Sequence, residues 1–254
     1  MTDLQGKTAL VTGASRGIGR GIAQRLAQDG ALVAVHYGTN EAAAKDVVAS
    51  ISEAGGRAFA IGAELGKDGD VENLFTQLEE GLRKHTGETA LDIVVNNAGI
   101  GSTGSVEEAT AEDFDHVFAV NAKAPLFIIQ RALPLMGDGG RIINISSGVT
   151  RIAFPGAISY AMTKGALDVL GRTLAKQLGA RNITVNNVAV GFIATDATAP
   201  LMEDPETGAW LSSVAALGRV GHPADMADIV AFLASDDARY ITGALIDATG
   251  GGQL

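Results

Sequence analysis

The feature that most constrains the fold of this chain is a regular alternation of short apolar runs with longer segments of helical period. This alternation is typical of βαβ units, in which a helix connects each parallel strand to the next. Strands are expected at residues 8–12, 32–37, 58–62, 91–96, 141–146, 184–190 and 244–247. Helices are expected to begin near Gly17, Asn40, Asp68, Thr110, Ser159 and Pro223, with Asn40, Asp68 and Thr110 as N-caps.

The expected strands are almost uninterrupted runs of Val, Ile, Leu and Ala, as parallel strands covered on both faces require. No Pro-, Ser- or charge-rich linker divides the 254 residues. The sequence therefore predicts one α/β domain over residues 1–254, a Rossmann-like doubly wound parallel sheet of about seven strands with helices on both faces. Its longest irregular segment, 192–221, is expected to carry a short helix around Trp210 and to form a lid over the substrate.

The composition excludes several kinds of function. The chain has no cysteine, which rules out a disulfide scaffold, a cysteine-ligated metal and a thiol nucleophile, and no metal site is expected. Its 29 acidic and 19 basic residues give a net charge of −10, which disfavours binding to nucleic acids or anionic membranes. Because neither a signal-like N-terminus nor an apolar run of about 18 residues is present, we expect a cytoplasmic protein with a small-molecule ligand.

The segment from Thr12 to Gly19 follows the first expected strand and leads directly into a helix. In such a strand–turn–helix unit, Gly13 permits the tight turn, Gly17 lets the backbone approach a phosphate, and Gly19 lets the helix pack closely on the sheet. The helix N-terminus then attracts the phosphate. The sequence predicts a dinucleotide site here, with contacts from Gly13, Ser15, Arg16, Gly17, Ile18 and Gly19.

The same residues permit an alternative function. Gly13-Ala14-Ser15-Arg16-Gly17 also matches the G-x-S-x-G turn that presents the nucleophile of α/β-hydrolases. A hydrolase would need a later acid and histidine, and of the four histidines only His222 is expected in a suitable loop. This alternative is the weaker one.

The end of the second expected strand indicates which dinucleotide is bound. An Asp or Glu about 20 residues past the glycines would bind the ribose hydroxyls of NAD. The stretch from His36 to Asn40 contains no acid. A 2′-phosphate would instead be accepted by Arg16 together with Thr39 and Asn40, which favours NADP(H) over NAD(H). Tyr37 is a further expected cofactor contact.

Tyr160 and Lys164 are four residues apart at the start of an expected helix, just after a strand that ends at Ser146-Ser147. Side chains at this spacing share one helix face, so the ammonium can favour the ionised form of the phenol and make it an acid/base group. An aromatic helix start followed by an exposed lysine explains the pair about equally well when it is considered alone.

Taken in order along the chain, these segments resemble the short-chain dehydrogenase/reductase family, in its classical form, and most closely its bacterial 3-oxoacyl-acyl-carrier-protein reductases. Thr12–Gly19 is similar to the TGxxxGxG cofactor loop of the family, and residues 96–99 to its NNAG motif. Asn121, Ser147, Tyr160 and Lys164 correspond to its catalytic tetrad, with Ser147 chosen over Ser146 because the family spacing to the tyrosine is 13 residues.

The resemblance implies a role for each residue of the tetrad. Tyr160 would be the acid/base, Ser147 would bind the substrate oxygen, Lys164 would bind the nicotinamide ribose and assist Tyr160, and Asn121 would position a proton-relaying water. It further implies cofactor contacts from Glu64, Asn97, Ala98, Gly99, Gly191, Ile193 and Thr195, a substrate pocket with Phe154, Phe192 and Trp210, and a homotetramer or dimer. Two departures from the family pattern are Val190 in place of a proline and Glu64 in place of an aspartate.

The predicted function is NADP(H)-dependent interconversion of a ketone or aldehyde and an alcohol. One alternative is a 3-oxoacyl-acyl-carrier-protein reductase, which needs a basic docking surface; Arg131 and Arg172 could supply it, but Asp138 and Asp168 lie near them in sequence. A dinucleotide-binding regulator without turnover is the less favoured alternative, because such a protein has no use for Tyr160 and Lys164.

Overall fold

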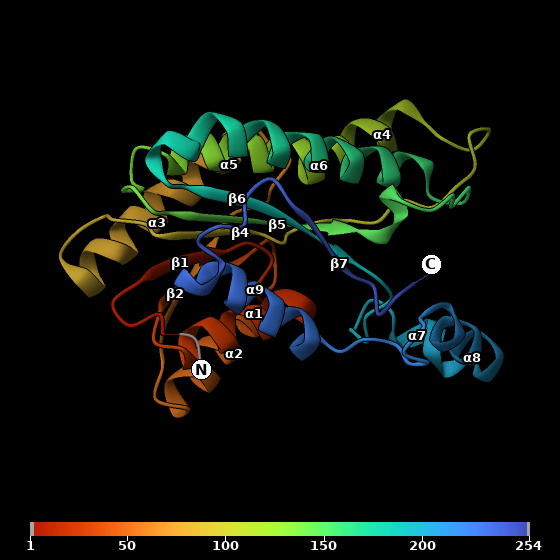
Figure 1. Cartoon of the computed structure of the whole chain (residues 1–254), viewed down its shortest axis with the longest axis horizontal. Coiled ribbons are helices and arrows are strands. Elements are labelled where there is room, and N and C mark those ends of the chain that lie inside the picture. Colours follow the sequence, from red (N-terminus) through yellow and green to blue (C-terminus); the bar gives the residue numbers. More distant parts are fainter. Residues whose placement is uncertain (1–2, 253–254) are drawn as a thin grey trace.

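A computed structural model describes residues 3–252 and contains a seven-stranded parallel sheet in the order β3-β2-β1-β4-β5-β6-β7 (Figure 1). The expected parallel Rossmann-like sheet is therefore confirmed, with strand ends shifted by no more than a few residues. The strands are β1 Thr8–Val11, β2 Leu32–Tyr37, β3 Arg57–Gly62, β4 Ile93–Asn96, β5 Arg141–Ser147, β6 Thr184–Val190 and β7 Leu245–Ala248.

Helices cover both faces of this sheet. They are α1 Gly17–Gln28, α2 Glu41–Glu53, α3 Asp70–Thr86, α4 Ala111–Phe118, α5 Ala124–Ala132, α6 Ile158–Leu178, α7 Ala199–Glu203, α8 Pro205–Val214 and α9 Pro223–Ala234. Asn40 and Thr110 cap their helices as expected, accepting hydrogen bonds from the amides of Ala43 and Asp113. The prediction of Asp68 as an N-cap is wrong. The N-cap of α3 is the next residue, Gly69, whose φ of +75° is a conformation that glycine adopts readily, and the helix begins at Asp70.

Two hydrophobic cores lie on opposite faces of the sheet because successive side chains of a strand alternate between its faces. On β1, Ala9 and Val11 pack in the core formed with α1, α2 and α9, whereas Leu10 packs in the core formed with α3, α5 and α6. Figure 1 shows α1, α2 and α9 on one side of the strands and α5 and α6 on the other. This burial on both faces explains why the strands are apolar throughout.

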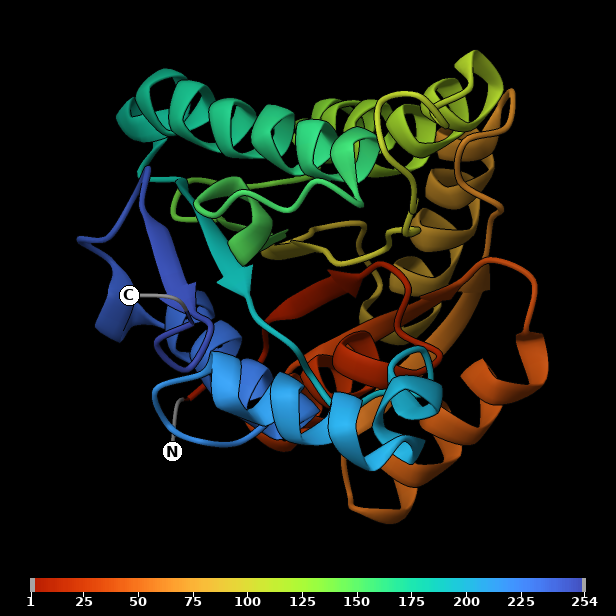
Figure 2. The ribbon, with the colours of Figure 1, turned by 90° about the vertical axis from the view of Figure 1, so that its right-hand side faces the viewer.

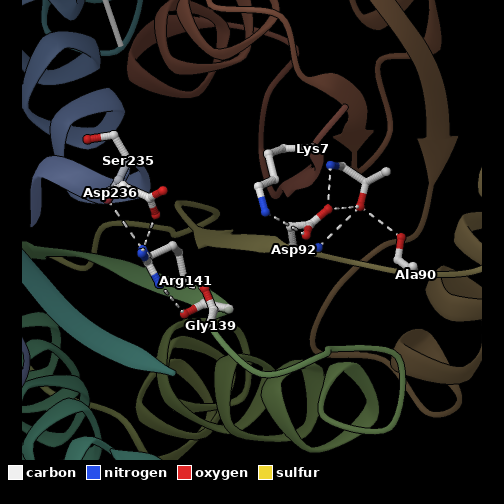
Figure 3. Close-up of polar contacts among 9 residues, drawn as sticks. Lys7, Ala90, Asp92, Gly139, Arg141, Ser235 and Asp236 are labelled. Carbon is white, nitrogen blue, oxygen red and sulfur yellow. Dashed lines mark hydrogen bonds and ion pairs between the residues drawn. The ribbon is translucent and has the colours of Figure 1, made fainter. Parts of the chain in front are cut away.

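The amino-terminal edge of the sheet is tied together by two charged side chains (Figure 3). Asp92, just before β4, accepts hydrogen bonds from the amide and hydroxyl of Thr8 at 2.9 and 3.1 Å. Arg141, which is 7% exposed, bonds the carbonyls of Gly139, Gly140 and Ser235 and pairs with Asp236. These contacts connect β1, β4 and β5 to the end of α9 at the edge farthest from the glycine loop.

The carboxyl edge of the sheet carries the candidate site. The strand order reverses between β1 and β4, and ligands of doubly wound sheets bind at the carboxyl ends of strands around such a reversal. Figure 2 turns this edge toward the viewer, with α7 and α8 in light blue below it. The segment 192–221 thus contains two helices rather than the single one expected, and Trp210 lies in α8.

Candidate active site

Lys164 and Tyr160 lie one turn apart on α6 at the carboxyl edge of the sheet. Lys164 is 4% exposed, and its Nζ donates a 2.8 Å hydrogen bond to the carbonyl of Ile145 in β5. The same ammonium lies 5.6 Å from the centroid of the Tyr160 ring. A lysine buried beside a tyrosine supports the acid/base hypothesis over the exposed lysine that the sequence alone also allowed.

Asn121 is held in a π-helical turn, Ala119–Lys123, between α4 and α5. Its side chain accepts a 2.9 Å hydrogen bond from the Ile100 amide and donates to the Ile100 carbonyl at 2.9 Å and to the Thr163 hydroxyl at 3.2 Å. Such π turns are common at functional sites. A Cβ at Gly99 would lie 3.3 Å from Asn121 Oδ1 and 3.6 Å from Lys164 Nζ, so these two side chains border the same glycine.

Ser147 is the last residue of β5 and caps the short turn that follows, with its Oγ accepting a 3.3 Å hydrogen bond from the Val149 amide. Ser147 and Tyr160 both line one cavity of about 260 Å³. The neighbouring Ser146 is fully buried and points away from this cavity, because adjacent residues of a strand face opposite sides. The geometry therefore favours Ser147 as the residue that meets a substrate.

The cavity beside Ser147 and Tyr160 is mainly apolar. Phe154, Phe192 and Trp210, the three residues expected in the substrate pocket, all line it, and the rings of Phe192 and Trp210 are 5.8 Å apart. The helix α8 contributes Trp210, Leu211 and Val214. The segment 192–221 therefore forms one wall of the cavity, as a substrate lid would.

The glycine loop has the shape of a phosphate cradle. Gly13 and Gly17 have φ angles of +62° and +55°. A Cβ at Gly19 would overlap the Gly13 carbonyl oxygen and the side-chain Nδ2 of Asn97. The N-cap residue of α1, Arg16, makes no side-chain cap, and the first turn holds no acid, so the positive end of the helix is open. Glycine loop and helix end together fit a dinucleotide pyrophosphate.

Asn97 and Ala98 brace this loop from the end of β4. Asn97 Nδ2 donates to the carbonyls of Thr12 and Gly13 at 2.8 and 3.1 Å. The amides of Asn97 and Ala98 both donate to the Thr12 hydroxyl at 2.9 Å. The Asn97 side chain and both backbone amides thus hold the start of the glycine loop in place.

His36 braces the same loop from the other side, and the sequence analysis did not identify it. Its Nδ1 accepts a 3.0 Å hydrogen bond from the Gly13 amide, and its Nε2 lies 2.9 Å from the Ala63 carbonyl. Burial lowers the pKa of His36 from 6.5 to about 4, although the Ala63 carbonyl and the Asp70 carboxylate raise it. The ring is therefore neutral near pH 7. The sequence feature that could have identified His36 is its position as a titratable residue within an otherwise apolar strand.

The residues expected to select the dinucleotide lie in the glycine loop and at the ends of β2 and β3. Arg16 and Thr39 are exposed, and Asn40 uses its side chain to cap α2. The Tyr37 ring packs over Gly62, where a Cβ would lie 2.7 Å from it. Glu64 is exposed and lies 3.7 Å from Lys67. The stretch from His36 to Asn40, at the end of β2, carries no acidic side chain.

The loop after β6 remains ordered by backbone pairing, although Val190 replaces the family proline. Val190 continues the ladder between Ser147 and Ala248. Beyond it, the Ala194 amide donates to the Gly221 carbonyl at 2.8 Å, and the Gly221 amide donates to the Phe192 carbonyl at 3.0 Å. A Cβ at Gly17 would lie 3.3 Å from Thr195 Cγ2, so this loop closes against the cofactor loop, and Gly191 lies against the backbone of Thr249.

Neither a metal-binding group nor a membrane-spanning helix is found in the part of the chain that the structure describes. Residues 3–252 contain no group of three His, Asp or Glu side chains arranged for a metal ion. Over the same residues, no helix is both long and apolar enough to cross a bilayer.

Comparisons with known proteins agree with this geometry. Residues 13–253 match the family described as enoyl-(acyl carrier protein) reductase. The angucycline C-6 ketoreductase LanV, solved with bound NADP, is 57% identical with a TM-score of 0.95, over 98% of this chain and 96% of its own. The promiscuous reductase LugOII, which catalyses keto-reduction at C1 during lugdunomycin biosynthesis, is 53% identical with a TM-score of 0.97 over 100% of both chains. The hydroxynaphthalene reductase-like protein Arp2 of Metarhizium brunneum is 43% identical over 98% of this chain and 95% of its own.

Similarity at this level over nearly the full length, together with the Tyr160–Lys164 pair, defines an oxidoreductase that acts on CH–OH and C=O groups. The chain belongs to the short-chain dehydrogenase/reductase family. The hydrolase alternative is therefore wrong. In residues 3–252 no hydrogen bond joins Ser15 to His222, whose amide instead donates to Asp225 at the start of α9.

Proposed function

We propose that the protein is an NADP(H)-dependent ketoreductase of fused-ring aromatic ketones. The observation that carries this proposal is the apolar cavity that Ser147 and Tyr160 line together and of which helix α8 forms one wall. NADPH would supply the hydride for the carbonyl carbon. The protein would supply the binding pocket, the proton and the donors that stabilise the carbonyl oxygen as it becomes negative.

Each residue of the tetrad has a role in the reduction. The hydroxyl groups of Ser147 and Tyr160 donate hydrogen bonds to the carbonyl oxygen, and Tyr160 then transfers its proton to that oxygen. The buried ammonium of Lys164 stabilises the charge that remains on the phenol oxygen. Asn121 keeps the backbone around Ile100 in place beside Gly99 and Lys164, where a water chain can return the proton.

The cofactor preference follows from charge at the end of β2. With Arg16 exposed in the glycine loop and no acid from His36 to Asn40, a 2′-phosphate would meet a cation and would not be repelled. LanV was solved with NADP, which agrees with this preference. The close packing around Gly13, Gly17 and Gly19 supports a pyrophosphate site in this loop, and Ile193 and Thr195 are the residues proposed to contact the nicotinamide.

The substrate class follows from the cavity walls. Phe154, Phe192 and Trp210 give flat apolar surfaces that suit fused aromatic rings better than a sugar. The relatives named for angucycline and hydroxynaphthalene substrates favour the same class. A carrier-protein substrate is less favoured, because Arg131 is paired with Glu72 and Glu79 and packs over Phe75, and so is not free to form a docking surface.

The assembly and the location form part of the proposal. Helices α5 and α6 carry exposed apolar side chains, including Leu126, Phe127, Met162 and Val169, and β7 exposes Leu245. Pairing of copies through these faces would bury them, which supports a homotetramer or a dimer. A cytoplasmic location agrees with the demand for NADPH, which metabolism regenerates there.

The decisive experiment measures oxidation of NADPH by the purified protein with 1-tetralone and related bicyclic ketones. We expect Tyr160→Phe to lower kcat by about 10²–10⁴-fold, the usual contribution of a general acid, while the affinity for NADPH is kept. NADH should support a lower kcat/KM than NADPH. Tight NADPH binding without reduction of any aromatic ketone or 3-oxoacyl thioester would contradict the proposal and favour a regulator. Reduction of the thioester alone would favour the carrier-protein alternative.

A further inference from the structure

Two guanidinium groups line the otherwise apolar cavity, and they differ in how far their donors are used. Arg219 bonds both carboxylate oxygens of Asp225, at 2.7 and 3.0 Å, and also the Val220 carbonyl. Arg151 uses one nitrogen, Nη1, to bond Asp247. In the described residues 3–252, Asp247 is the only side chain that bonds the Arg151 guanidinium, so Nε and Nη2 keep donors free.

Arg151 also lies only four residues after Ser147, one of the two groups proposed to meet the reacting carbonyl. It directly follows the 3-10 turn Gly148–Thr150, whose N-cap is Ser147. The Arg151 amide donates a hydrogen bond to the Gly148 carbonyl at 3.0 Å. The Thr150 hydroxyl donates to the Ser147 carbonyl at 3.1 Å and tightens this turn. Ser147 and Arg151 are therefore presented to the cavity by one short, internally bonded segment.

Asp247 keeps the guanidinium at the cavity wall. Its Oδ1 accepts hydrogen bonds from the Thr249 amide and hydroxyl at 3.0 and 2.6 Å, which orients the carboxylate toward Arg151. Burial raises the pKa of Asp247, but the hydrogen bonds from Thr249 and the ion pair with Arg151 outweigh it, so that the pKa lies below its usual value. The Arg151 side chain remains 42% exposed and so is accessible to a ligand in the cavity.

We propose that Arg151 is a specificity-determining residue that binds a second oxygen of the substrate, a phenol, phenolate or quinone oxygen on a ring fused to the ketone ring. The ketone oxygen is bound by Ser147 and Tyr160 at one point, and the second oxygen by the free donors of Arg151 at another. This two-point contact orients a flat molecule that apolar walls alone would allow to rotate. The inference rests on the proposed function and assigns the substrate as an oxygenated aromatic ketone.

The test compares kcat/KM for 1-tetralone with kcat/KM for 5-, 6-, 7- and 8-hydroxy-1-tetralone, which place a phenol at successive positions of the fused ring. The wild-type protein is expected to prefer at least one hydroxytetralone. Arg151→Met, which keeps the apolar stem, is expected to reduce that preference by about 10- to 100-fold, the range for a lost hydrogen bond to a charged group. Arg151→Lys should retain part of the preference, because the charge remains without the planar fork.

Two matched variants separate substrate binding from structural support. Asp247→Asn keeps an acceptor for Thr249 and removes the charge that pairs with Arg151, and Arg219→Met removes the other guanidinium of the cavity. Arg219→Met should keep the preference for the hydroxytetralone, whereas Asp247→Asn should reduce it by less than Arg151→Met does, because the guanidinium remains but is held less firmly. An equal loss of preference in Asp247→Asn and Arg151→Met would show that Arg151 acts only as part of a structural ion pair. A loss of preference in Arg219→Met alone would show that Arg219, and not Arg151, binds the second oxygen.

The inference and the proposed function fail in different ways. Reduction of 1-tetralone that depends on Tyr160, with no preference for any hydroxytetralone, overturns the role of Arg151 and leaves the ketoreductase assignment intact. The absence of any Tyr160-dependent reduction overturns the assignment itself.

Discussion

His36 and Gly13 are joined by a 3.0 Å hydrogen bond in which the imidazole Nδ1 accepts from the first glycine amide of the cofactor loop. The next amide of the loop, that of Ala14, donates to the His36 carbonyl at 2.7 Å. One residue of β2 thus orients two successive amides of the loop. Because only the neutral ring can accept at Nδ1 while donating from Nε2 to Ala63, the shape of the loop depends on the protonation state of His36.

The first prediction concerns stability in acid. The pKa of His36 is lowered by burial from 6.5 to about 4, so the unfolded chain takes up a proton below pH 6.5 that the folded chain excludes. The contribution of the neutral ring is complete above pH 6.5 and is lost as the pH falls toward 4, by a total of about 3 kcal/mol. Urea unfolding between pH 7 and 4 measures this slope.

His36→Asn is the matched variant for this measurement, because its side chain can still accept a hydrogen bond but does not titrate. We expect it to be less stable than wild type at pH 7 and to have a shallower loss of stability below pH 6.5. Carboxylates such as Asp225, whose pKa its Arg219 partner holds at about 2, titrate equally in both proteins and cancel in the difference. Parallel curves for the two proteins would refute the role given to His36.

The second prediction concerns close packing in the glycine loop. Gly19→Ala places a methyl group against the Gly13 carbonyl and the Asn97 amide, so the variant should lose about 1–3 kcal/mol of stability and most of its NADPH affinity. Gly165→Ala in α6 is the control, because its methyl group enters open space and should raise stability by about 0.4–1 kcal/mol. NADPH fluorescence titration and urea unfolding check both. Normal NADPH binding by Gly19→Ala would count against the cradle.

The third prediction concerns the amino-terminal edge of the sheet (Figure 3). Arg141→Met leaves the carbonyls of Gly139 and Ser235 without the guanidinium donor and should cost about 2–4 kcal/mol. Asp236→Asn should cost less than about 1 kcal/mol, because the Asp236 side chain is 93% exposed. Since this edge is opposite the site, the folded Arg141→Met protein should keep its kcat. Thermal unfolding and steady-state rates test this, and a large fall in kcat at full folding would contradict it.

The fourth prediction concerns the clamp on Ile100. Asn121→Ala removes the hydrogen bonds to the Ile100 amide and carbonyl and should cost about 1–3 kcal/mol while lowering kcat more than it weakens NADPH binding. Thr163→Val removes the hydrogen bond from Asn121 Nδ2 and the one that the Thr163 hydroxyl donates to the Tyr160 carbonyl, but it keeps both bonds to Ile100 and should be milder in both respects. Single-turnover rates and cofactor titrations separate the two effects. Equal losses in the two variants would show that Asn121 does not act through Ile100.

Sequence periodicity was sufficient for the fold because the pattern of burial is local. Leu10 and Val11 are adjacent and both apolar, which is possible only if both faces of β1 are covered, and the two cores confirm this. Helix caps were less certain, since Asn40 and Asp68 look alike as N-caps. Asn40 caps α2, whereas the chain at residue 69 turns into the left-handed conformation that glycine adopts, so that α3 begins at Asp70.

The sequence by itself determined the fold and the family and proposed Tyr160 and Lys164 as an acid/base pair, because strand burial, the glycine spacing and the four-residue separation of the pair are all local properties. Only the tertiary structure decided which distant residues complete the site. His36 meets Gly13, Asn121 meets Ile100, and Arg151 meets Asp247 across 96 residues of chain. Such contacts depend on the order in which parallel strands are placed side by side, which no local pattern specifies.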